Sequence, residues 1–262
     1  MINKTKLVKI IIPIYKSSIS KYERISFNQC LNILCNYEIE IITYDEIDIS
    51  EFSISKNINI KLYNKKYFSS IQGYNQLMLS KEFYYNYRDY KYILIYQLDA
   101  YVFYDKLAYW CLKDYDYIGS PWLVVSKNNT LKKWFLSQIN WFWDLFRELK
   151  IPLSANNQVG NGGFSLRKIS KFIDVLEKVD KKILYTYNHC NEVKYNEDVF
   201  WSLEIEKDPK LKLNKPKINE ASMFSVDGNP HDLLLDIKQL PFGCHGWNKS
   251  NQIQNWTTII EV

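Results

Sequence analysis

Residues 92–104, YILIYQLDAYVFY, decide how the rest of the sequence is interpreted. The stretch begins with an apolar run rich in β-branched and aromatic residues, which is typical of a strand buried on both faces. Within it stands a single acid, Asp99, which is costly to bury unless a cation or a hydrogen-bond donor pairs with it. Open α/β sheets bind ligands at the carboxyl ends of their strands. We therefore interpret Asp99 either as a ligand-binding acid at a strand end or as a turn residue that only holds a loop.

Strands and helices alternate on both sides of this stretch. Before it, apolar patterns predict strands at 7–14, 38–44 and 58–62 and helices at 20–34 and 69–79. After it, they predict helices at 106–112, 168–179 and 195–206, and strands at 115–122 and 164–166. This order predicts an α/β fold with a mixed, mainly parallel central sheet flanked by helices.

Composition limits the class of protein. The 262 residues contain 34 Lys and Arg against 29 Asp and Glu, and the basic residues are scattered. A net charge of +5 suits an anionic ligand or an anionic membrane surface and gives no nucleic-acid footprint. Five cysteines without a CxxC pattern favour a reducing compartment. Because no apolar run approaches the roughly 20 residues of a membrane span, we expect a cytoplasmic protein, with the inner face of a membrane as an alternative location.

The segment 131–150, LKKWFLSQINWFWDLFRELK, is unusually aromatic and has a helical, amphipathic pattern with basic residues at its ends. Three interpretations are open: a helix that buries an aromatic face in the core, an interfacial helix near a lipid-linked acceptor, or an aromatic wall for sugar rings.

Three glycines, Gly160, Gly162 and Gly163, lie within four residues of one another. They mark a backbone that needs positive φ or a close approach to a ligand. A β-turn explains one glycine, whereas three clustered glycines followed by Arg167 favour a site. The spacing does not match the GxGxxG of dinucleotide-binding folds.

Two adjacent acids, Glu197 and Asp198, follow Asn196, which is a natural N-cap. Acids in a first turn can merely stabilise the helix dipole. The same dipole also keeps a carboxylate ionised, as a general base requires. Because adjacent helical residues point about 100° apart, one acid can face a pocket while the other makes the cap.

His245 is one of three histidines and stands in a glycine-flanked loop, 240–249. An imidazole in a tight, irregular loop favours metal ligation or substrate contact over a place in the core. Lys249, close by, is a candidate phosphate contact.

The succession of these motifs resembles the GT-A class of nucleotide-sugar glycosyltransferases. The motifs are LDA at 98–100, GNGGFSLR at 160–167, NEDVFW at 196–201 and FGCHGW at 242–247. More narrowly, the chain resembles a bacterial family of domains of unassigned function that are presumed to be GT-A enzymes. The resemblance covers residues 7–250 and implies one GT-A-like (Rossmann-like) domain over 1–262, with a nucleotide-binding half at 7–125 and an acceptor and catalytic half at 126–250.

The resemblance also implies a metal site. Asp99 matches the start of the DxD motif, so it would contact the metal or the donor ribose, while His245 matches a C-terminal histidine that ligates the metal in several GT-A enzymes. Tyr101 stands where the second acid of DxD belongs, which leaves metal dependence open. Mn²⁺ or Mg²⁺ at this point would neutralise the diphosphate leaving group.

The remaining roles follow from the same resemblance. The acidic pair would supply the base of an inverting transfer, with Asp198 preferred over Glu197. The donor sugar and acceptor would lie near Asn161, Gly162, Gly163 and Trp247. The donor nucleotide would lie near Pro13, Tyr15, Asp45, Gly73, Asn75, Asp99, Ala100 and Lys249.

We therefore expect an inverting glycosyltransferase that uses a nucleotide-sugar donor and a glycan or lipid-linked acceptor in bacterial surface-glycan synthesis. Two alternatives stay open. A sugar nucleotidyltransferase is disfavoured because IIPIYKSS at 11–18 is not a Gly-rich, basic loop. A carbohydrate-binding GT-A-like module with weak or no chemistry is favoured by the missing second acid and disfavoured by the retained Glu197, Asp198 and His245.

Overall fold

The computed structural model describes residues 5–55, 58–122, 158–228 and 239–262. The aromatic segment 131–150 lies outside the described residues, and so does the predicted boundary between the two halves at 125.

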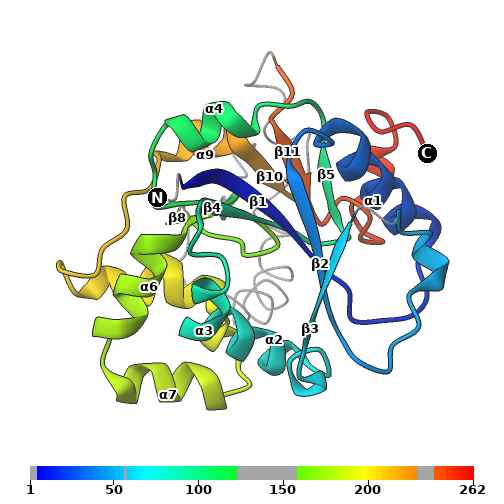
Figure 1. Cartoon of the computed structure of the whole chain (residues 1–262). Helices are drawn as coiled ribbons and strands as arrows, with labels where there is room; N and C mark the ends of the chain where they lie inside the picture. Colours follow the sequence, from blue (N-terminus) through cyan, green and yellow to red (C-terminus); the bar gives the residue numbers. More distant parts are fainter. Residues whose placement is uncertain (1–4, 56–57, 123–157, 229–238) are drawn as a thin grey trace, which may run out of the picture.

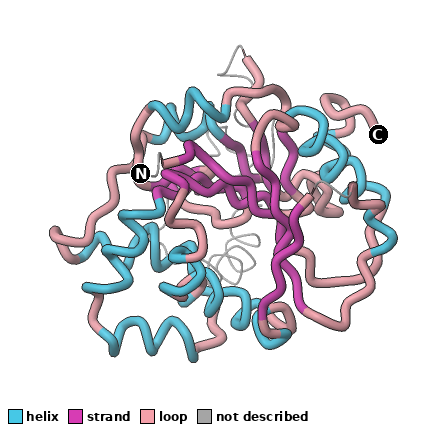
Figure 2. The backbone as a smooth tube through the Cα atoms, viewed as in Figure 1, coloured by secondary structure: helices cyan, strands magenta, loops and turns pink. Residues whose placement is uncertain are grey.

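A six-stranded sheet forms the centre of the molecule, with the strand order β3-β2-β1-β4-β9-β6 (Figures 1 and 2). The first four strands are mutually parallel, and β9 is antiparallel to both β4 and β6. The predicted mixed, mainly parallel sheet is thus confirmed. The strand bounds are β1 Lys6–Pro13, β2 Glu38–Tyr44, β3 Asn59–Tyr63, β4 Tyr90–Tyr96, β6 Tyr117–Ile118 and β9 Phe164–Lys168.

Helices cover both faces of this sheet, because successive side chains of its strands point to opposite sides. On β1, Ile10 and Ile12 belong to one buried cluster and Ile11 to the other. The first cluster packs against α1 (Lys21–Ile33), α4 (Leu107–Leu112) and α9 (Ile218–Phe224). The second packs against α2 (Ile71–Met78), α3 (Lys81–Tyr85), α6 (Ile169–Lys178) and α7 (Lys181–His189), on the other side of the sheet in Figure 1.

We interpreted the stretch 92–104 as a buried strand that contains one acid, and the structure divides it into two strands in two sheets. β4 ends at Tyr96, and the chain turns so that the Ala100 amide donates to the Gln97 carbonyl at 2.9 Å. β5 (Ala100–Val102) then joins a three-stranded sheet of order β10-β11-β5, with β10 at Ser225–Asp227 and β11 at Gly243–His245. Asp99 therefore lies in the turn that joins the two sheets.

The predicted strand 115–122 is also divided. Its first part is β6, and its second part, β7 (Pro121–Trp122), pairs with β8 (Gln158–Val159) in a sheet of its own. The predicted helix 195–206 is segmented as well, into α8 (Glu197–Val199), a π-helical turn at Phe200–Glu204 and a 3₁₀ turn at Ile205–Lys207.

The other predicted helices are confirmed with shifted ends. Ser20 caps α1 through a capping box with Glu23, and Ser70 caps α2 by accepting from the Gly73 amide. The remaining short elements are 3₁₀ turns at Ser50–Phe52, Lys65–Tyr67 and Val193–Tyr195, and α11 at Ile253–Trp256. Among the described helices, none combines the length and the apolar character that crossing a membrane requires.

Candidate active site

A cavity of about 500 Å³ opens at the carboxyl ends of β1 and β4, where open α/β sheets bind ligands. Its volume lies in the usual range for small-molecule sites. The structure brings nine of the residues predicted from sequence to its wall: Pro13, Tyr15, Asn75, Asn161, Gly162, Gly163, Glu197, Asp198 and His245. Side chains from the first 75 residues thus face side chains from beyond residue 160.

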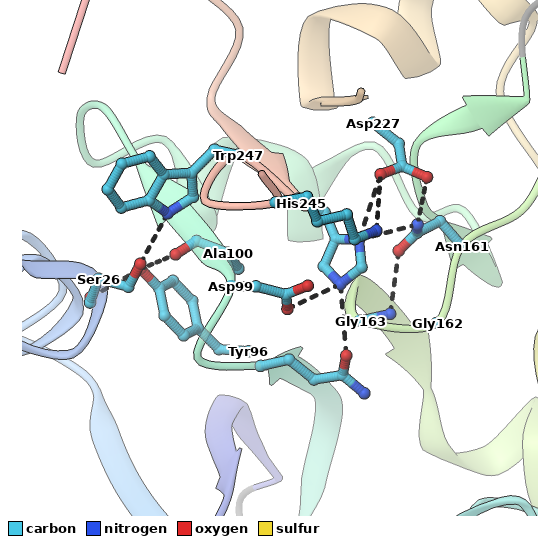
Figure 3. Close-up of polar contacts among 12 residues, drawn as sticks. Ser26, Tyr96, Asp99, Ala100, Asn161, Gly162, Gly163, Asp227, His245 and Trp247 are labelled. Carbon is cyan, nitrogen blue, oxygen red and sulfur yellow. Dashed lines mark hydrogen bonds and ion pairs between the residues drawn. The ribbon is translucent and has the colours of Figure 1, made fainter. Parts of the chain in front are cut away.

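Trp247 is one of the predicted ligand contacts that the structure places elsewhere. Its side chain is fully buried, and its indole nitrogen donates to the Ser26 hydroxyl at 2.8 Å (Figure 3). It packs edge-on against Tyr22 and Tyr101. Trp247 is therefore a core residue that holds the C-terminal loop, and it does not line the cavity.

Five predicted nucleotide contacts also lie outside the cavity wall, and one of them, Asp99, contacts the wall residue His245. Gly73 is needed because a Cβ there would stand 2.1 Å from the Lys66 carbonyl oxygen, so it serves helix packing. Ala100 is buried within β5, whereas Asp45 is exposed beyond the end of β2. Lys249 is also exposed, and its Nζ lies 4.0 Å from the Asp227 carboxylate.

The small sheet places His245 between two acids. His245 is the register partner of Asp227 on β10 and of Ala100 on β5, the residue after Asp99. Its Nε2 lies 3.0 Å from Asp99 Oδ1, and its Nδ1 lies 3.4 Å from Asp227 Oδ1 (Figure 3). Burial opposes the charged imidazole, but both carboxylates outweigh burial and raise the pKa of His245 to about 10. Likewise, burial would raise the pKa of Asp99, yet His245 lowers it to about 2.

Asn161 organises the glycine turn. It has the positive φ, 64°, that we predicted for the neighbouring glycines, and asparagine tolerates this conformation better than most residues. Its Oδ1 accepts from the Gly163 amide at 3.0 Å, while its Nδ2 donates to Asp227 Oδ2 at 2.9 Å and lies 3.0 Å from His245 Nδ1 (Figure 3). The turn is thereby tied to the His245 side of the cavity.

The glycines are required by close approach. A Cβ on Gly162 would stand 1.9 Å from Glu197 Oε1, and one on Gly163 would stand 2.0 Å from His245 Nε2. Both distances are far below van der Waals contact. The turn therefore brings bare backbone against the acid pair on one side and the imidazole on the other.

Glu197 is held by a buried arginine. Arg167 Nη2 donates to Glu197 Oε1 at 2.9 Å, and the two side chains are 0% and 4% exposed. The guanidinium also donates to the Tyr84 hydroxyl, to the Ser165 hydroxyl and to the Gly162 carbonyl. Glu197 Oε2 is buried with no hydrogen-bond partner among the described residues. The ion pair therefore fixes Glu197 Oε1 between the guanidinium and the glycine turn.

Asp198 is different. It lines the cavity, is partly exposed, and accepts a hydrogen bond from the Val199 amide at 2.8 Å. Burial is the main cause that raises its pKa to about 7, and the negative charge of Glu197 adds to it. We expected the helix dipole to keep this acid fully ionised, and burial outweighs that effect. A carboxyl group with a pKa near neutrality suits general acid–base chemistry.

Asn75 holds the acid pair in place. Its Oδ1 accepts from the Glu197 amide at 3.2 Å, and its Nδ2 donates to Asn196 Oδ1 at 3.1 Å. The Asn196 side chain does not form the cap that we predicted. The Asn75 side chain on α2 instead accepts the hydrogen bond from the Glu197 amide at the start of the helix. Asn75 thus lines the cavity with its polar atoms already engaged.

A divalent cation was the one cofactor predicted. No three His, Cys, Asp or Glu side chains of the described residues converge to hold a metal ion. Asp99 and His245 nevertheless fit as two ligands, because Asp99 Oδ1 lies 3.0 Å from His245 Nε2, and this nitrogen faces the space that a Cβ on Gly163 would fill. A carboxylate and an imidazole are donors that Mn²⁺ and Mg²⁺ sites use, and Nε2 would release its proton on binding.

Sequence reasoning missed Asp227, which contacts both His245 and Asn161. The sequence does offer a hint, because Asp227 stands at the end of a short strand-like stretch, 224–227. Asp99 likewise follows an apolar stretch. What the sequence does not contain is the register that sets β10 beside β11.

Comparisons with known proteins agree with this architecture. A family model described as "Protein of unknown function (DUF5672)" matches residues 57–245. The structure resembles the galactosyltransferase LgtC in complex with donor and acceptor sugar analogs, with a TM-score of 0.54 at 14% identity over 95% of this chain and 91% of that one. It also resembles mouse xyloside xylosyltransferase 1, with a TM-score of 0.54 at 10% identity over 94% and 98% of the two chains. No curated protein matches the sequence. These likenesses establish the fold, which is that of known glycosyltransferases.

Proposed function

This chain belongs to the family described as protein of unknown function DUF5672, and from that premise we propose that it is a glycosyltransferase. It would move a sugar from a nucleotide-sugar donor to a glycan or lipid-linked acceptor, at the cytoplasmic side of a bacterial membrane during surface-glycan synthesis. The fold it shares with solved glycosyltransferases, one of which binds donor and acceptor sugar analogs, supports the class.

The observation that carries the proposal is the position of Asp198. Its carboxyl group has a pKa of about 7 and lines the same cavity as the glycine turn and His245. A binding module needs no acid tuned to neutral pH, whereas an inverting transferase uses one to activate the acceptor hydroxyl.

The reaction then runs as one displacement. Asp198 takes the proton of the acceptor hydroxyl while that oxygen forms a bond to the anomeric carbon. The bond from this carbon to the diphosphate oxygen breaks, and the nucleoside diphosphate leaves with the electron pair. Attack opposite the leaving group inverts the anomeric configuration. Arg167 holds Glu197, the residue before Asp198, in its place beside the glycine turn.

The diphosphate would lie near Asp99 and His245. A divalent cation bound there would neutralise the charge that develops on the leaving group. Among the chain's own residues, Asp227 and Asn161 keep the imidazole oriented, and Lys249 remains a candidate for a phosphate contact from outside the cavity wall.

A donor screen tests the proposal. The protein is incubated with UDP-, GDP-, CMP- and TDP-sugars, with and without Mn²⁺, and released nucleotide is measured. We expect one donor to be turned over, and NMR of the glycoside formed on an added acceptor should show inverted configuration. Tight glycan binding without turnover of any donor would favour a carbohydrate-binding module, and pyrophosphate formation from a sugar phosphate and a nucleotide would favour a nucleotidyltransferase. Retained configuration would exclude the single displacement by Asp198.

Tyr15 should contribute to nucleotide binding. It follows the end of β1 and leaves 53% of its surface exposed, and it lines the same cavity as the apolar side chains of Phe68 and Ile71. An exposed ring at a strand end suits stacking on a base, which contributes about 1–3 kcal/mol. Tyr15→Ala should therefore weaken nucleotide affinity by roughly 10-fold or more, measured by calorimetry. Tyr109→Ala on α4, an equally exposed tyrosine outside the cavity wall, is the control and should bind as the wild type does.

A further inference from the structure

The missing second acid of the DxD motif raises the question of which group takes its place. Position 101 cannot supply it. The Tyr101 ring packs against Phe103 and Trp247, at centroid distances of 5.2 and 5.9 Å, in the cluster on the far side of the small sheet. On β5 the residues at 100 and 102 face the main core, so the side chain at 101 points the other way.

A different side chain reaches the Asp99–His245 pair. Gln97 Oε1 lies 3.3 Å from His245 Nε2, the same nitrogen that lies 3.0 Å from Asp99 Oδ1. Gln97 also lines the cavity, whereas the Tyr101 ring does not. A Cβ on Gly163 would stand 2.6 Å from Gln97 Oε1 and 2.0 Å from His245 Nε2, so the glycine leaves room for both groups.

The backbone fixes Gln97 in this position. Its amide donates to the Gly163 carbonyl and its carbonyl accepts from the Ala100 amide, both at 2.9 Å. The backbone of Gln97 is therefore hydrogen-bonded both to the glycine turn and to the first residue of β5, which limits where its side chain can lie.

We propose that Gln97, Asp99 and His245 are the protein ligands of a divalent cation, with the Gln97 amide oxygen in place of the second acid. This proposal deepens the proposed function and rests on it. Amide and carboxylate oxygens suit Mg²⁺ and Mn²⁺. Neighbouring ligands of an octahedral ion at about 2.1 Å lie about 3.0 Å apart, which is close to the 3.0 and 3.3 Å separations around Nε2.

His245 carries the support that metal-binding histidines usually have. The nitrogen that does not face Gln97 and Asp99, Nδ1, lies 3.4 Å from the Asp227 carboxylate. A carboxylate on the second ring nitrogen orients an imidazole for metal binding. Asp227 therefore acts as a positioning residue, on the opposite edge of the ring from the metal.

The test is a titration of the full chain with Mn²⁺ alone, followed by the loss of the free-ion EPR signal. Wild type should bind one equivalent. Gln97→Glu adds a charge to the ligand set and should bind at least about tenfold tighter, whereas Gln97→Leu should bind at least about tenfold more weakly. Tyr101→Asp, which restores DxD in the sequence alone, should not tighten binding. Gln72→Leu on α2, a glutamine that donates to the Asn188 carbonyl, is the control and should bind as wild type does.

Two results would overturn the proposal: Mn²⁺ affinity in Gln97→Leu equal to that of wild type, or tighter binding in Tyr101→Asp without tighter binding in Gln97→Glu. Circular dichroism of each variant checks that it is folded, and Gln97→Glu, which keeps the side-chain shape, gives a result even if Tyr101→Asp does not fold. The titration contains no donor. A protein that turns over a nucleotide sugar without binding Mn²⁺ refutes this inference alone, and one that binds Mn²⁺ as expected but transfers no sugar refutes only the proposed function.

Discussion

Asp198→Asn should lower kcat by roughly 10²–10⁴-fold while nucleotide affinity changes little, because the amide cannot accept the acceptor's proton. The pH profile gives a second readout. The base works only when it is ionised, and burial together with Glu197 raises the pKa of Asp198 to about 7. Wild-type kcat/KM should therefore fall about tenfold per pH unit below that value and level off above it. The residual kcat/KM of the variant should not show this fall below pH 7.

The same substitution should stabilise the fold at high pH. The folded-state pKa of Asp198, about 7, lies above the ordinary value of 3.8, so ionisation at pH 8 costs the native state roughly 2–4 kcal/mol. Stability from this group is fully present below pH 4 and is lost as pH rises through 7. Removing the charge should raise Tm at pH 8 by several degrees and leave it almost unchanged at pH 4.

The control for Asp198 is Asp174→Asn on α6, a partly exposed acid paired with Lys171 and Lys178. It should leave both rate and pH profile as in wild type, because exposed ion pairs contribute little. An Asp198→Asn protein that kept most of its rate, or that lost stability at pH 8, would contradict the role of Asp198 as the general base.

Arg167→Met should destabilise the protein by about 3–5 kcal/mol in urea unfolding, since it leaves the Glu197 carboxylate buried without its partner. The variant should also lose activity, because a displaced Glu197 would move the neighbouring Asp198 and the glycine turn, which Glu197 contacts at Gly162. The double variant Arg167→Met, Glu197→Gln should recover much of the stability, since no uncompensated charge is then buried.

An exposed ion pair provides the comparison for Arg167. Lys178→Met breaks the pair with Asp174 on α6, whose side chains are 61% and 36% exposed. We expect a change below about 0.5 kcal/mol there. If Arg167→Met proved equally mild, or if the double variant were no more stable than the single one, Glu197 would not depend on the guanidinium for its place in the fold.

The sequence by itself determined the layered α/β architecture, because side-chain periodicity is local and each strand or helix shows its own buried face. Ile10, Ile11 and Ile12 show the alternation directly, and the helix at 169–178 buries the face that its spacing predicts. The sequence also singled out Asp99, Asp198 and His245 from their chemical surroundings, and two of them, Asp198 and His245, line the cavity.

Tertiary structure alone decided which groups surround those residues. Trp247 is in the core because Ser26, Tyr22 and Tyr101 meet it there, and Asp227 reaches His245 only because β10 pairs with β11. The pKa of Asp198 depends on burial by elements far along the chain. Charge, hydrogen bonding and dielectric environment act through space between segments that no local pattern relates, and so only the folded chain determines the chemistry of its site.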